Sequence, residues 1–320
     1  MSFLSINALI LLLRFLVVVE EIPIIVVNYN GIELLKKYLD SVLQTQYPSK
    51  VIVVDNGSKD GSVEYLKKKG VEVIQLDKNY GPAYARNVAI KKFKTKFMAF
   101  LDNDVMVPKD WLDSLVEVIS SDDKIAAVQS LYTEWPYGDE PREIPWFSTA
   151  AALTRRDVLE KVGGFDEHYF FYWEDAELSW RLYRTGYRVL MAPKSRVYHE
   201  AHGTFKKLPS PFTSYLLMRN QLILLLTYYS KKKIITNFLP IFIIRLFQSF
   251  LPPNRTAKLK GVLSVFTELD YVKLKRKELE KISINWDDIF LNYVGKEPFG
   301  YPEFRSLIEA IKMKVLNKKD

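Results

Sequence analysis

Residues 97–105 have the sequence Phe-Met-Ala-Phe-Leu-Asp-Asn-Asp-Val, an apolar run that ends in two carboxylates at positions i and i+2. The apolar part, 97–101, predicts a buried strand. Asp102 and Asp104 at its end can both reach one hard divalent cation, and such a cation neutralises phosphate oxygens. The alternative is a polar turn, because Asp and Asn side chains bond their own backbone in turns.

Short β-branched runs recur on both sides of this stretch. Together with residues 97–101 they predict strands at 24–27, 51–54, 71–76, 125–128 and 188–191. Amphipathic stretches alternate with them and predict helices, among them 34–43, 110–119 and 174–185. This alternation is typical of an α/β fold with a mostly parallel sheet covered on both faces. Since ligands of such sheets bind beyond the carboxyl ends of the strands, motifs at strand ends carry the most weight. Residues 131–148, rich in Pro and aromatic side chains, predict a long loop.

Two further polar motifs lie near predicted strands. Residues 55–62, Asp-Asn-Gly-Ser-Lys-Asp-Gly-Ser, follow the strand 51–54. Asp55 can accept hydrogen bonds from a base or a ribose, although an ordinary strand-to-helix turn explains the same residues. Residues 79–87, Asn-Tyr-Gly-Pro-Ala-Tyr-Ala-Arg-Asn, precede the strand 97–101. The guanidinium of Arg86 suits a diphosphate, and a surface arginine on a helix is the alternative.

Acidic and aromatic side chains are densest between residues 163 and 178. Glu174 and Asp175 open the helix predicted at 174–185, directly after a run of aromatic residues. Acids in a first turn are favoured by the helix dipole, and a general base in an aromatic-walled pocket is the functional interpretation. His199 ends a later strand and could be a third metal ligand, although a lone histidine is more often structural.

Composition limits the class of protein. The 320 residues, 48% hydrophobic and 26% charged, exclude a disordered chain and a polytopic membrane protein and accommodate one large domain with an appendage. The chain has no cysteine, which excludes disulfides, thiolate zinc sites and cysteine nucleophiles. The net charge of +8 is unevenly distributed, because residues 201–281 hold fifteen Lys and Arg against only four Asp and Glu. Such a basic segment predicts an anionic surface as partner, and its long apolar runs favour lipid over nucleic acid.

Three apolar segments bear on membrane contact. Residues 3–19 predict a membrane-touching helix, with a packed extra helix or a start codon placed too early as alternatives. Residues 215–229 and 234–251 predict two amphipathic helices lying at a bilayer surface. One true span and a soluble packing domain are the alternatives for this pair.

In their order along the chain, these motifs resemble the family 2 glycosyltransferases, most closely the rhamnosyltransferase and galactofuranosyltransferase-like branch. The resemblance covers residues 22–230 and includes Val-Val-Asn-Tyr-Asn at 26–30, Gly-Gly-Phe-Asp-Glu at 163–167 and Trp-Glu-Asp-Ala-Glu-Leu at 173–178. It implies a GT-A fold, a nucleotide-diphospho-sugar donor, inversion at the anomeric carbon and a divalent cation, either Mg²⁺ or Mn²⁺.

The resemblance also implies a role for each matching residue. Asp175 is the implied catalytic base. The implied donor-binding residues are Asn28, Asn30, Asp55, Asn56, Arg86, Asn87, Asp102 and Asn103. The implied acceptor- or sugar-binding residues are Trp173, Glu174 and Glu177. The implied metal ligands are Asp102, Asp104 and His199. Tyr215, Arg219 and Asn220 match a recurrent Tyr-x-x-x-Arg-Asn pattern to which the resemblance assigns no role.

These observations predict an apolar N-terminal segment at 1–21, a GT-A catalytic domain at 22–210 and a basic, helical, membrane-associating region at 211–320. We expect the acceptor to be a saccharide or a lipid-linked saccharide of the cell envelope, and the enzyme to lie on the cytoplasmic face of the membrane, peripherally or by a single anchor. An anionic membrane surface is an expected partner and nucleic acid is not.

Three other classes of protein compete with this interpretation. A glycoside hydrolase has no need of the Asp-x-Asp motif. A sugar-nucleotide synthesising enzyme would have a Gly-rich basic loop where Asn28-Tyr29-Asn30-Gly31 follows the first strand. A non-catalytic membrane scaffold with a degenerate transferase domain would not need acids at 55, 102, 104 and 175.

Overall fold

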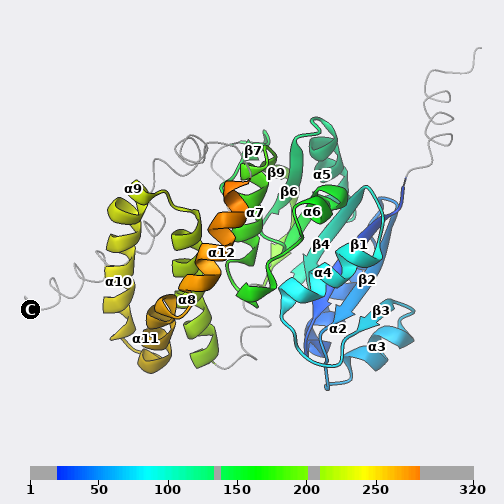
Figure 1. Cartoon of the computed structure of the whole chain (residues 1–320). Helices are drawn as coiled ribbons and strands as arrows, with labels where there is room; N and C mark the ends of the chain where they lie inside the picture. The colour runs from blue at the N-terminus through cyan, green and yellow to red at the C-terminus, as the bar shows by residue number, and fades with distance from the viewer. Residues whose placement is uncertain (1–19, 133–137, 201–209, 282–320) are drawn as a thin grey trace, which may run out of the picture.

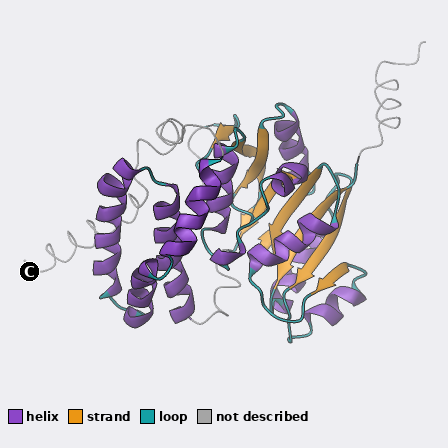
Figure 2. Cartoon of the chain, in the orientation of Figure 1, coloured by secondary structure: helices purple, strands orange, loops and turns teal. Residues whose placement is uncertain are grey.

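The computed structural model describes residues 20–132, 138–200 and 210–281. Their centre is an eight-stranded sheet in the order β3-β2-β1-β4-β8-β6-β9-β7, drawn with helices packed around it in Figure 1 and Figure 2. The strands of this sheet are β1 (Ile22–Asn28), β2 (Ser49–Asp55), β3 (Glu72–Gln75), β4 (Phe97–Asp102), β6 (Ile125–Leu131), β7 (Arg142–Glu143), β8 (Ala151–Arg155) and β9 (Arg188–Arg196). All six strands predicted from the sequence are confirmed.

Strand direction also agrees with the prediction of a mostly parallel sheet. β1 pairs in parallel with β2 and β4, β2 with β3, and β6 with β9. Two members of the sheet were not predicted: β7, which pairs antiparallel with β9, and β8, which runs antiparallel between β4 and β6. The sequence of β8, Ala-Ala-Leu-Thr-Arg, has a single β-branched residue, yet all five residues are buried. The neighbouring strands on both sides therefore determine β8, and local propensity does not.

Helices cover both faces of the sheet, because successive side chains of a strand point to opposite faces. In β1, Ile24 and Val26 belong to the core beneath α2, α3 and α5, whereas Ile25 belongs to the core that also contains α4, α6, α7 and α8. Within the described residues 20–132 and 138–200, the helices are α2 (Ile32–Leu43), α3 (Ser62–Lys68), α4 (Pro82–Lys92), α5 (Trp111–Ser120), α6 (Arg156–Lys161), η1 (Glu167–Tyr169) and α7 (Glu174–Arg184). The region 131–148 is a loop as predicted over most of its described part, except that β7 lies within it.

The C-terminal helices stand together beside α7 (Figure 1). They are α8 (Ser210–Tyr228), α9 (Lys231–Lys233), the π-helical turn η3 (Ile234–Phe238), α10 (Leu239–Ser249), α11 (Arg255–Leu263), η4 (Ser264–Phe266) and α12 (Leu269–Glu280).

Helix α8 corrects one membrane prediction. Leu222, Ile223, Leu224 and Leu225 are all 0% exposed, so this turn of the helix is covered around its circumference. A helix that is apolar all round is typical of a protein interior as well as of a membrane. The stretch 215–229 is therefore a core helix and does not lie at a bilayer surface.

Helix α10 is different, because a row of large apolar side chains on it is exposed. Ile235, Leu239, Ile243 and Phe247 follow one another at intervals of four residues and are 67, 45, 51 and 68% exposed. Residues four apart lie on one face of a helix. Among the helices that the structure describes, none is long and apolar enough to span a bilayer. The predicted segment 3–19 and the tail after residue 281 lie outside the described residues, and the predicted domain limits stay a prediction.

Candidate functional site

The site forms where β1, β2 and β4 end side by side. Register places Asn28 of β1 opposite Asp55 of β2, and Val27 of β1 opposite Asp102 of β4. A pocket opens beyond these strand ends. Six of the predicted site residues line it: Asn56, Arg86, Asp102, Asn103, Asp104 and His199. The pocket is also lined by residues of these motifs and of the aromatic run that were not named as site residues, namely Val27, Tyr29, Asn79, Pro82, Phe170 and Phe171.

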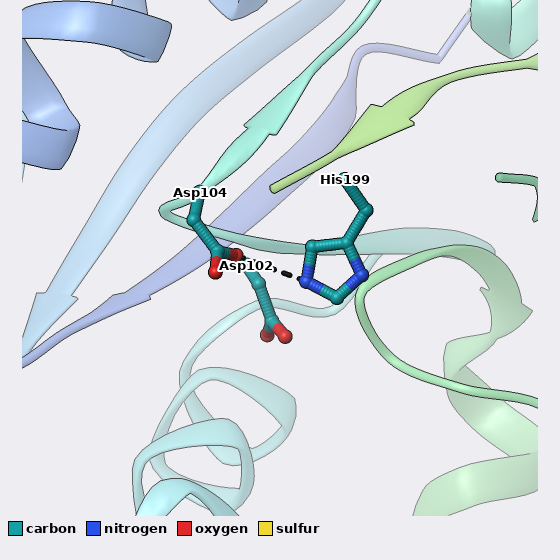
Figure 3. Close-up of side chains that lie close together, drawn as sticks. All are labelled: Asp102, Asp104 and His199. Carbon is teal, nitrogen blue, oxygen red and sulfur yellow. Dashed lines mark ion pairs between the residues drawn. The ribbon is translucent and has the colours of Figure 1, made fainter. Parts of the chain in front are cut away.

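A small two-stranded sheet brings His199 to the Asp-x-Asp motif. β5 (Val105–Met106) pairs antiparallel with β10 (Tyr198–His199), and His199 lies opposite Val105. As a result His199 Nε2 is 3.1 Å from Asp104 Oδ1, and Figure 3 shows these two side chains converging beside Asp102. One ligand atom from each of the three residues lies within 4.8 Å of the other two. Two carboxylates and one imidazole are a donor set that suits Mn²⁺ and can also hold Mg²⁺.

The pKa values of His199 and Asp102 are shifted by burial and by the charges that lie close to them. Burial alone would lower the pKa of His199, but its hydrogen bond to Asp104 and the charges of both carboxylates raise it overall. Burial also raises the pKa of Asp102, and the nearby charge of Arg86 opposes that shift. The cluster therefore concentrates negative charge, and a divalent cation would relieve the repulsion between its carboxylates.

Arg86 joins this cluster to the acidic residues at the start of α7. Its Nη2 lies 3.3 Å from Asp102 Oδ1, and its Nη1 lies 3.0 Å from Glu174 Oε1 and 3.8 Å from Asp175 Oδ1. Arg86 is only 4% exposed, so these charge interactions are poorly screened by water. The guanidinium predicted to face a diphosphate thus lines the pocket and holds three carboxylates together.

The two acids that open α7 have raised pKa values. Burial, followed by repulsion from Asp175, raises the pKa of Glu174 to about 7, against the opposing effect of Arg86. Burial also raises the pKa of Asp175. The Asp175 side chain is 20% exposed and that of Glu174 is 6% exposed, so Asp175 is the more accessible of the two. A carboxylate with a raised pKa near the operating pH is a competent general base.

Thr149 orients Asp175 and was not predicted. Its backbone N–H donates to Asp175 Oδ2 at 3.1 Å, and its hydroxyl donates to Oδ1 at 3.1 Å. Thr149 directly precedes Ala150, whose carbonyl accepts from the backbone N–H of Asp102. Because this segment leads into the unpredicted strand β8, no local pattern in the sequence indicated its role.

The predicted asparagines and Asp55 mostly bond one another. Asn28 Nδ2 donates to Asp55 Oδ2 at 2.9 Å, and Asn103 Nδ2 donates to Asn28 Oδ1 at 2.8 Å. Asp55 Oδ1 accepts from the backbone N–H of Ser58 at 2.8 Å, and both Asn28 and Asp55 are 0% exposed. The Oδ1 atom of Asn30 accepts from the backbone N–H of Lys59. These side chains join the loops at the strand ends, and direct contact of Asn28 and Asp55 with the donor stays a prediction.

Asn87 and Glu177 are two further predicted site residues that bond other groups of the protein. Asn87 exchanges hydrogen bonds with the backbone of Phe165 and is buried beneath the Gly-Gly-Phe-Asp-Glu loop. The carboxylate of Glu177 accepts from Arg181 and from the hydroxyl of Tyr228 on α8. Tyr228 belongs to α8, so Glu177 joins two helices, and its contact with a sugar stays a prediction.

Trp173 is the residue immediately before α7. It has left-handed backbone geometry, with φ of 70°, and it packs partly buried against the core. Its ring packs against the core, and Trp173 is not among the described residues that line the pocket.

Comparison with known proteins agrees with the family resemblance that the order of the motifs indicated. The family model "Glycosyl transferase family 2" matches residues 24–177, and "Glycosyl transferase family group 2" matches residues 141–251. The pre-mycofactocin glycosyltransferase of Mycobacterium tuberculosis is 32% identical over 179 residues, which are 47% of this chain and 37% of that protein. The chain therefore spans little more than a third of the length of that relative.

Two further proteins are similar over longer stretches. N-acetylglucosaminyl-diphospho-decaprenol L-rhamnosyltransferase of M. tuberculosis is 26% identical over 58% of this chain and 78% of its own length. The mannosyltransferase of Pyrobaculum calidifontis in complex with GDP-Man and Mn²⁺ superposes with a TM-score of 0.53 at 16% identity, over 92% of this chain and 80% of that one. At this identity the second comparison establishes the fold alone, which is the GT-A fold.

Proposed function

Because the chain belongs to the rhamnosyltransferase-like branch of the family 2 glycosyltransferases, we propose that it transfers a sugar from a nucleotide-diphospho-sugar to an acceptor hydroxyl with inversion at the anomeric carbon. One observation supports this most directly: Arg86, which lines the pocket, connects a carboxylate of the Asp-x-Asp motif to Glu174 and Asp175. A transferase needs these two groups of acids close together. One group would hold the cation that neutralises the leaving diphosphate, and the other would accept the proton of the incoming hydroxyl.

The residues at the Asp-x-Asp motif suit the donor's diphosphate. Asp102, Asp104 and His199 would hold a divalent cation, Mg²⁺ or Mn²⁺, which when bound would neutralise the diphosphate oxygens. Asn56, which lines the same pocket, accepts from the backbone N–H of Tyr80 through Oδ1. Asn56 thereby holds the segment that includes Asn79 against the strand ends, where the nucleotide would lie.

Asp175 would take the proton of the acceptor. The acceptor oxygen bonds to the anomeric carbon, the bond from that carbon to the diphosphate oxygen breaks, and the hydroxyl proton passes to a carboxylate oxygen of Asp175. Such a single displacement inverts the anomeric configuration. Thr149 holds the carboxylate in place, and Arg86 keeps enough of it ionised despite burial.

Thermal unfolding with UDP, dTDP, GDP and CMP, each with and without Mn²⁺, tests donor binding. A ligand at a hundred times its dissociation constant stabilises a protein by about 2.7 kcal/mol. We expect a shift with one nucleotide that depends on Mn²⁺ and is lost in Asp104→Ala. Asp175→Asn should abolish transfer while leaving nucleotide affinity within a few-fold. If no nucleotide shifts a cooperatively folded sample, the proposal of a transferase gives way to a degenerate, non-catalytic domain.

We further propose that the acceptor is a saccharide or lipid-linked saccharide, met at the cytoplasmic face of an anionic membrane. The relative named above acts on a decaprenol-linked substrate, as its name states. On this chain the exposed row on η3 and α10, which is Ile235, Leu239, Ile243 and Phe247, begins directly after Lys231-Lys232-Lys233. An apolar face beside clustered lysines is typical of a helix that binds anionic lipid.

Co-sedimentation with phosphatidylglycerol vesicles at low salt tests membrane contact. We expect the protein to bind them, and Phe247→Glu to weaken binding several-fold. Leu274→Glu is the matched control, because Leu274 is an exposed leucine (56%) on α12 and lies outside the row. A protein that stays in the supernatant with these vesicles, or loses binding equally in both variants, would contradict the membrane proposal.

A further inference from the structure

The segment just before α7 has strained backbone geometry. We call residues 170–173 the aromatic loop. Phe170, Tyr172 and Trp173 have φ angles of 58°, 68° and 70°. Left-handed geometry costs an L-residue other than glycine roughly 1–2 kcal/mol, so three such residues within four positions need strong support from their surroundings. Strain of this kind persists only where neighbouring structure holds it in place.

The aromatic loop connects the pocket to the acids. Phe170 and Phe171 line the pocket, and Trp173 is the residue that precedes Glu174 at the start of α7. The position of this loop therefore determines both one pocket wall and the point from which Glu174 and Asp175 project. A loop displaced by an ångström would move the acids relative to Arg86.

Asn220 on α8 holds the loop by its backbone. Its Nδ2 donates to the carbonyl oxygens of Tyr169, Phe171 and Tyr172 at 2.8, 2.8 and 3.0 Å. Asn220 is 0% exposed, and its Oδ1 accepts from Arg219 Nη1 at 2.7 Å. Only this orientation of the amide matches donor to acceptor on both sides, because three carbonyl oxygens face one end and a guanidinium faces the other.

Arg219 supports the same segment from its N-terminal side. Its Nη1 donates to the carbonyl oxygen of His168 at 3.1 Å, and its guanidinium pairs with Glu268 at 2.6 Å. His168 in turn bonds Glu268 at 2.8 Å and stacks on Tyr271 of α12 with ring centroids 3.8 Å apart. The two adjacent residues of α8 thus reach η1 and the aromatic loop in succession.

We infer that Asn220, supported by Arg219, is a positioning residue that holds the aromatic loop in its strained form and thereby places Glu174 and Asp175 for the reaction. This inference rests on the proposed transferase function for its catalytic consequence, but the contact between Asn220 and the loop stands independently of it. It also gives the Tyr-x-x-x-Arg-Asn pattern a physical role: a C-terminal helix is part of the support for the active site.

The experiment compares Asn220→Ala with Gln221→Ala. Both residues are buried on α8, at 0% and 1% exposure. The Gln221 amide oxygen accepts from Arg245 of α10, so its loss disturbs α8 on the side away from the loop. Asn220→Asp is a second variant, since it keeps the volume of the side chain and the contact with Arg219 but removes every donor to the loop.

The first readout is chymotrypsin cleavage, because the aromatic loop consists of residues that chymotrypsin recognises. Cleavage under native conditions follows the population of opened loop. We expect cleavage within 170–173, identified by fragment mass, to be at least about tenfold faster in Asn220→Asp and Asn220→Ala than in Gln221→Ala. Equal rates in these variants would overturn the inference.

The second readout separates placement from folding. We expect kcat to fall on the order of 10²-fold in the Asn220 variants, as for a misplacement of about one ångström, with Mn²⁺-dependent nucleotide binding kept within a few-fold. A kcat equal to that of Gln221→Ala would overturn the inference. If the wild-type protein transfers no sugar, the proposed function fails, and the cleavage rates alone still decide whether Asn220 holds the loop.

Discussion

Replacing Arg86 by methionine should destabilise the protein in a manner that depends on pH. The guanidinium is 4% exposed and lies 3.0, 3.3 and 3.8 Å from oxygens of Glu174, Asp102 and Asp175. Removing one partner of a buried ion pair costs roughly 3–5 kcal/mol, because the other charge stays buried without compensation. We expect a loss of this size at pH 8, measured as the free energy of unfolding in urea with an unchanged slope.

The direction of the pH effect follows from Glu174. Its pKa in the folded protein is raised from 4.5 to about 7, so the folded state holds this proton more tightly than the unfolded state. The corresponding stability is fully present below pH 4.5 and is lost as pH rises through 7. Without Arg86 the pKa rises further, because the cation that opposes the effect of burial is gone. The deficit of Arg86→Met should therefore be smaller at pH 5 than at pH 8.

Arg156→Met is the matched control. Arg156 is also buried, at 5% exposure, and pairs with Glu160, whose side chain is 48% exposed. Its removal leaves no buried carboxylate, so its deficit should be similar at both pH values. Adding Glu174→Gln to Arg86→Met should recover part of the loss at pH 8. A deficit of Arg86→Met that is equal at pH 5 and pH 8, without recovery in the double variant, would refute the reasoning.

Three further substitutions test other parts of the site. Thr149→Val removes the hydroxyl that bonds Asp175. We expect kcat to fall about tenfold, which is equivalent to about 1.4 kcal/mol, while KM stays unchanged. An unchanged kcat would show that the hydroxyl has no part in orienting the base. Gly81→Ala places a Cβ 2.5 Å from a carbonyl oxygen of the aromatic loop at a φ of +86°, whereas Gly70→Ala at +72° meets no atom within 4 Å. Backbone strain should lower the free energy of unfolding of both variants by roughly 1–2 kcal/mol. The close contact adds to this only in Gly81→Ala, so urea unfolding should show a clearly larger loss for that variant. Glu177→Gln should cost about 3 kcal/mol, because it breaks a buried ion pair with Arg181, while nucleotide binding stays within a few-fold. A large loss of nucleotide affinity would contradict a purely structural role for Glu177.

Local patterns predict the strands and the groups at their ends well. β1, β2 and β4 are nearly continuous in apolar or β-branched residues, and burial on both faces of a sheet requires such runs. The carboxyl ends of parallel strands meet at one edge, so local sequence is enough to place Asp102 and Asp104 at a site on that edge. The same argument does not reach β8, whose strand state depends on β4 and β6.

Tertiary position separates side chains that look alike in the sequence. Asn28, Asp55 and Asn87 occur in the same kinds of motif as Asn56 and Asp102, yet only the last two line the pocket, while the first three bond their neighbours in the interior. The helical segments 215–229 and 234–251 have similar apolar content, but α8 is enclosed whereas α10 exposes a row of its side chains. Which face of an element is covered depends on residues distant in the chain.

By itself, the sequence determined the class of sheet, the resemblance to the family and the acids proposed to carry the chemistry, because each strand and each motif is encoded within a few consecutive residues. Tertiary structure decided how those acids are arranged. The pairing of β5 with β10 brings His199 to Asp104, Arg86 joins two acidic groups that are 72 or more residues apart in the chain, and Asn220 reaches the aromatic loop from α8. Each of these contacts joins residues far apart in sequence, and only the packing of the whole chain brings them within hydrogen-bonding distance.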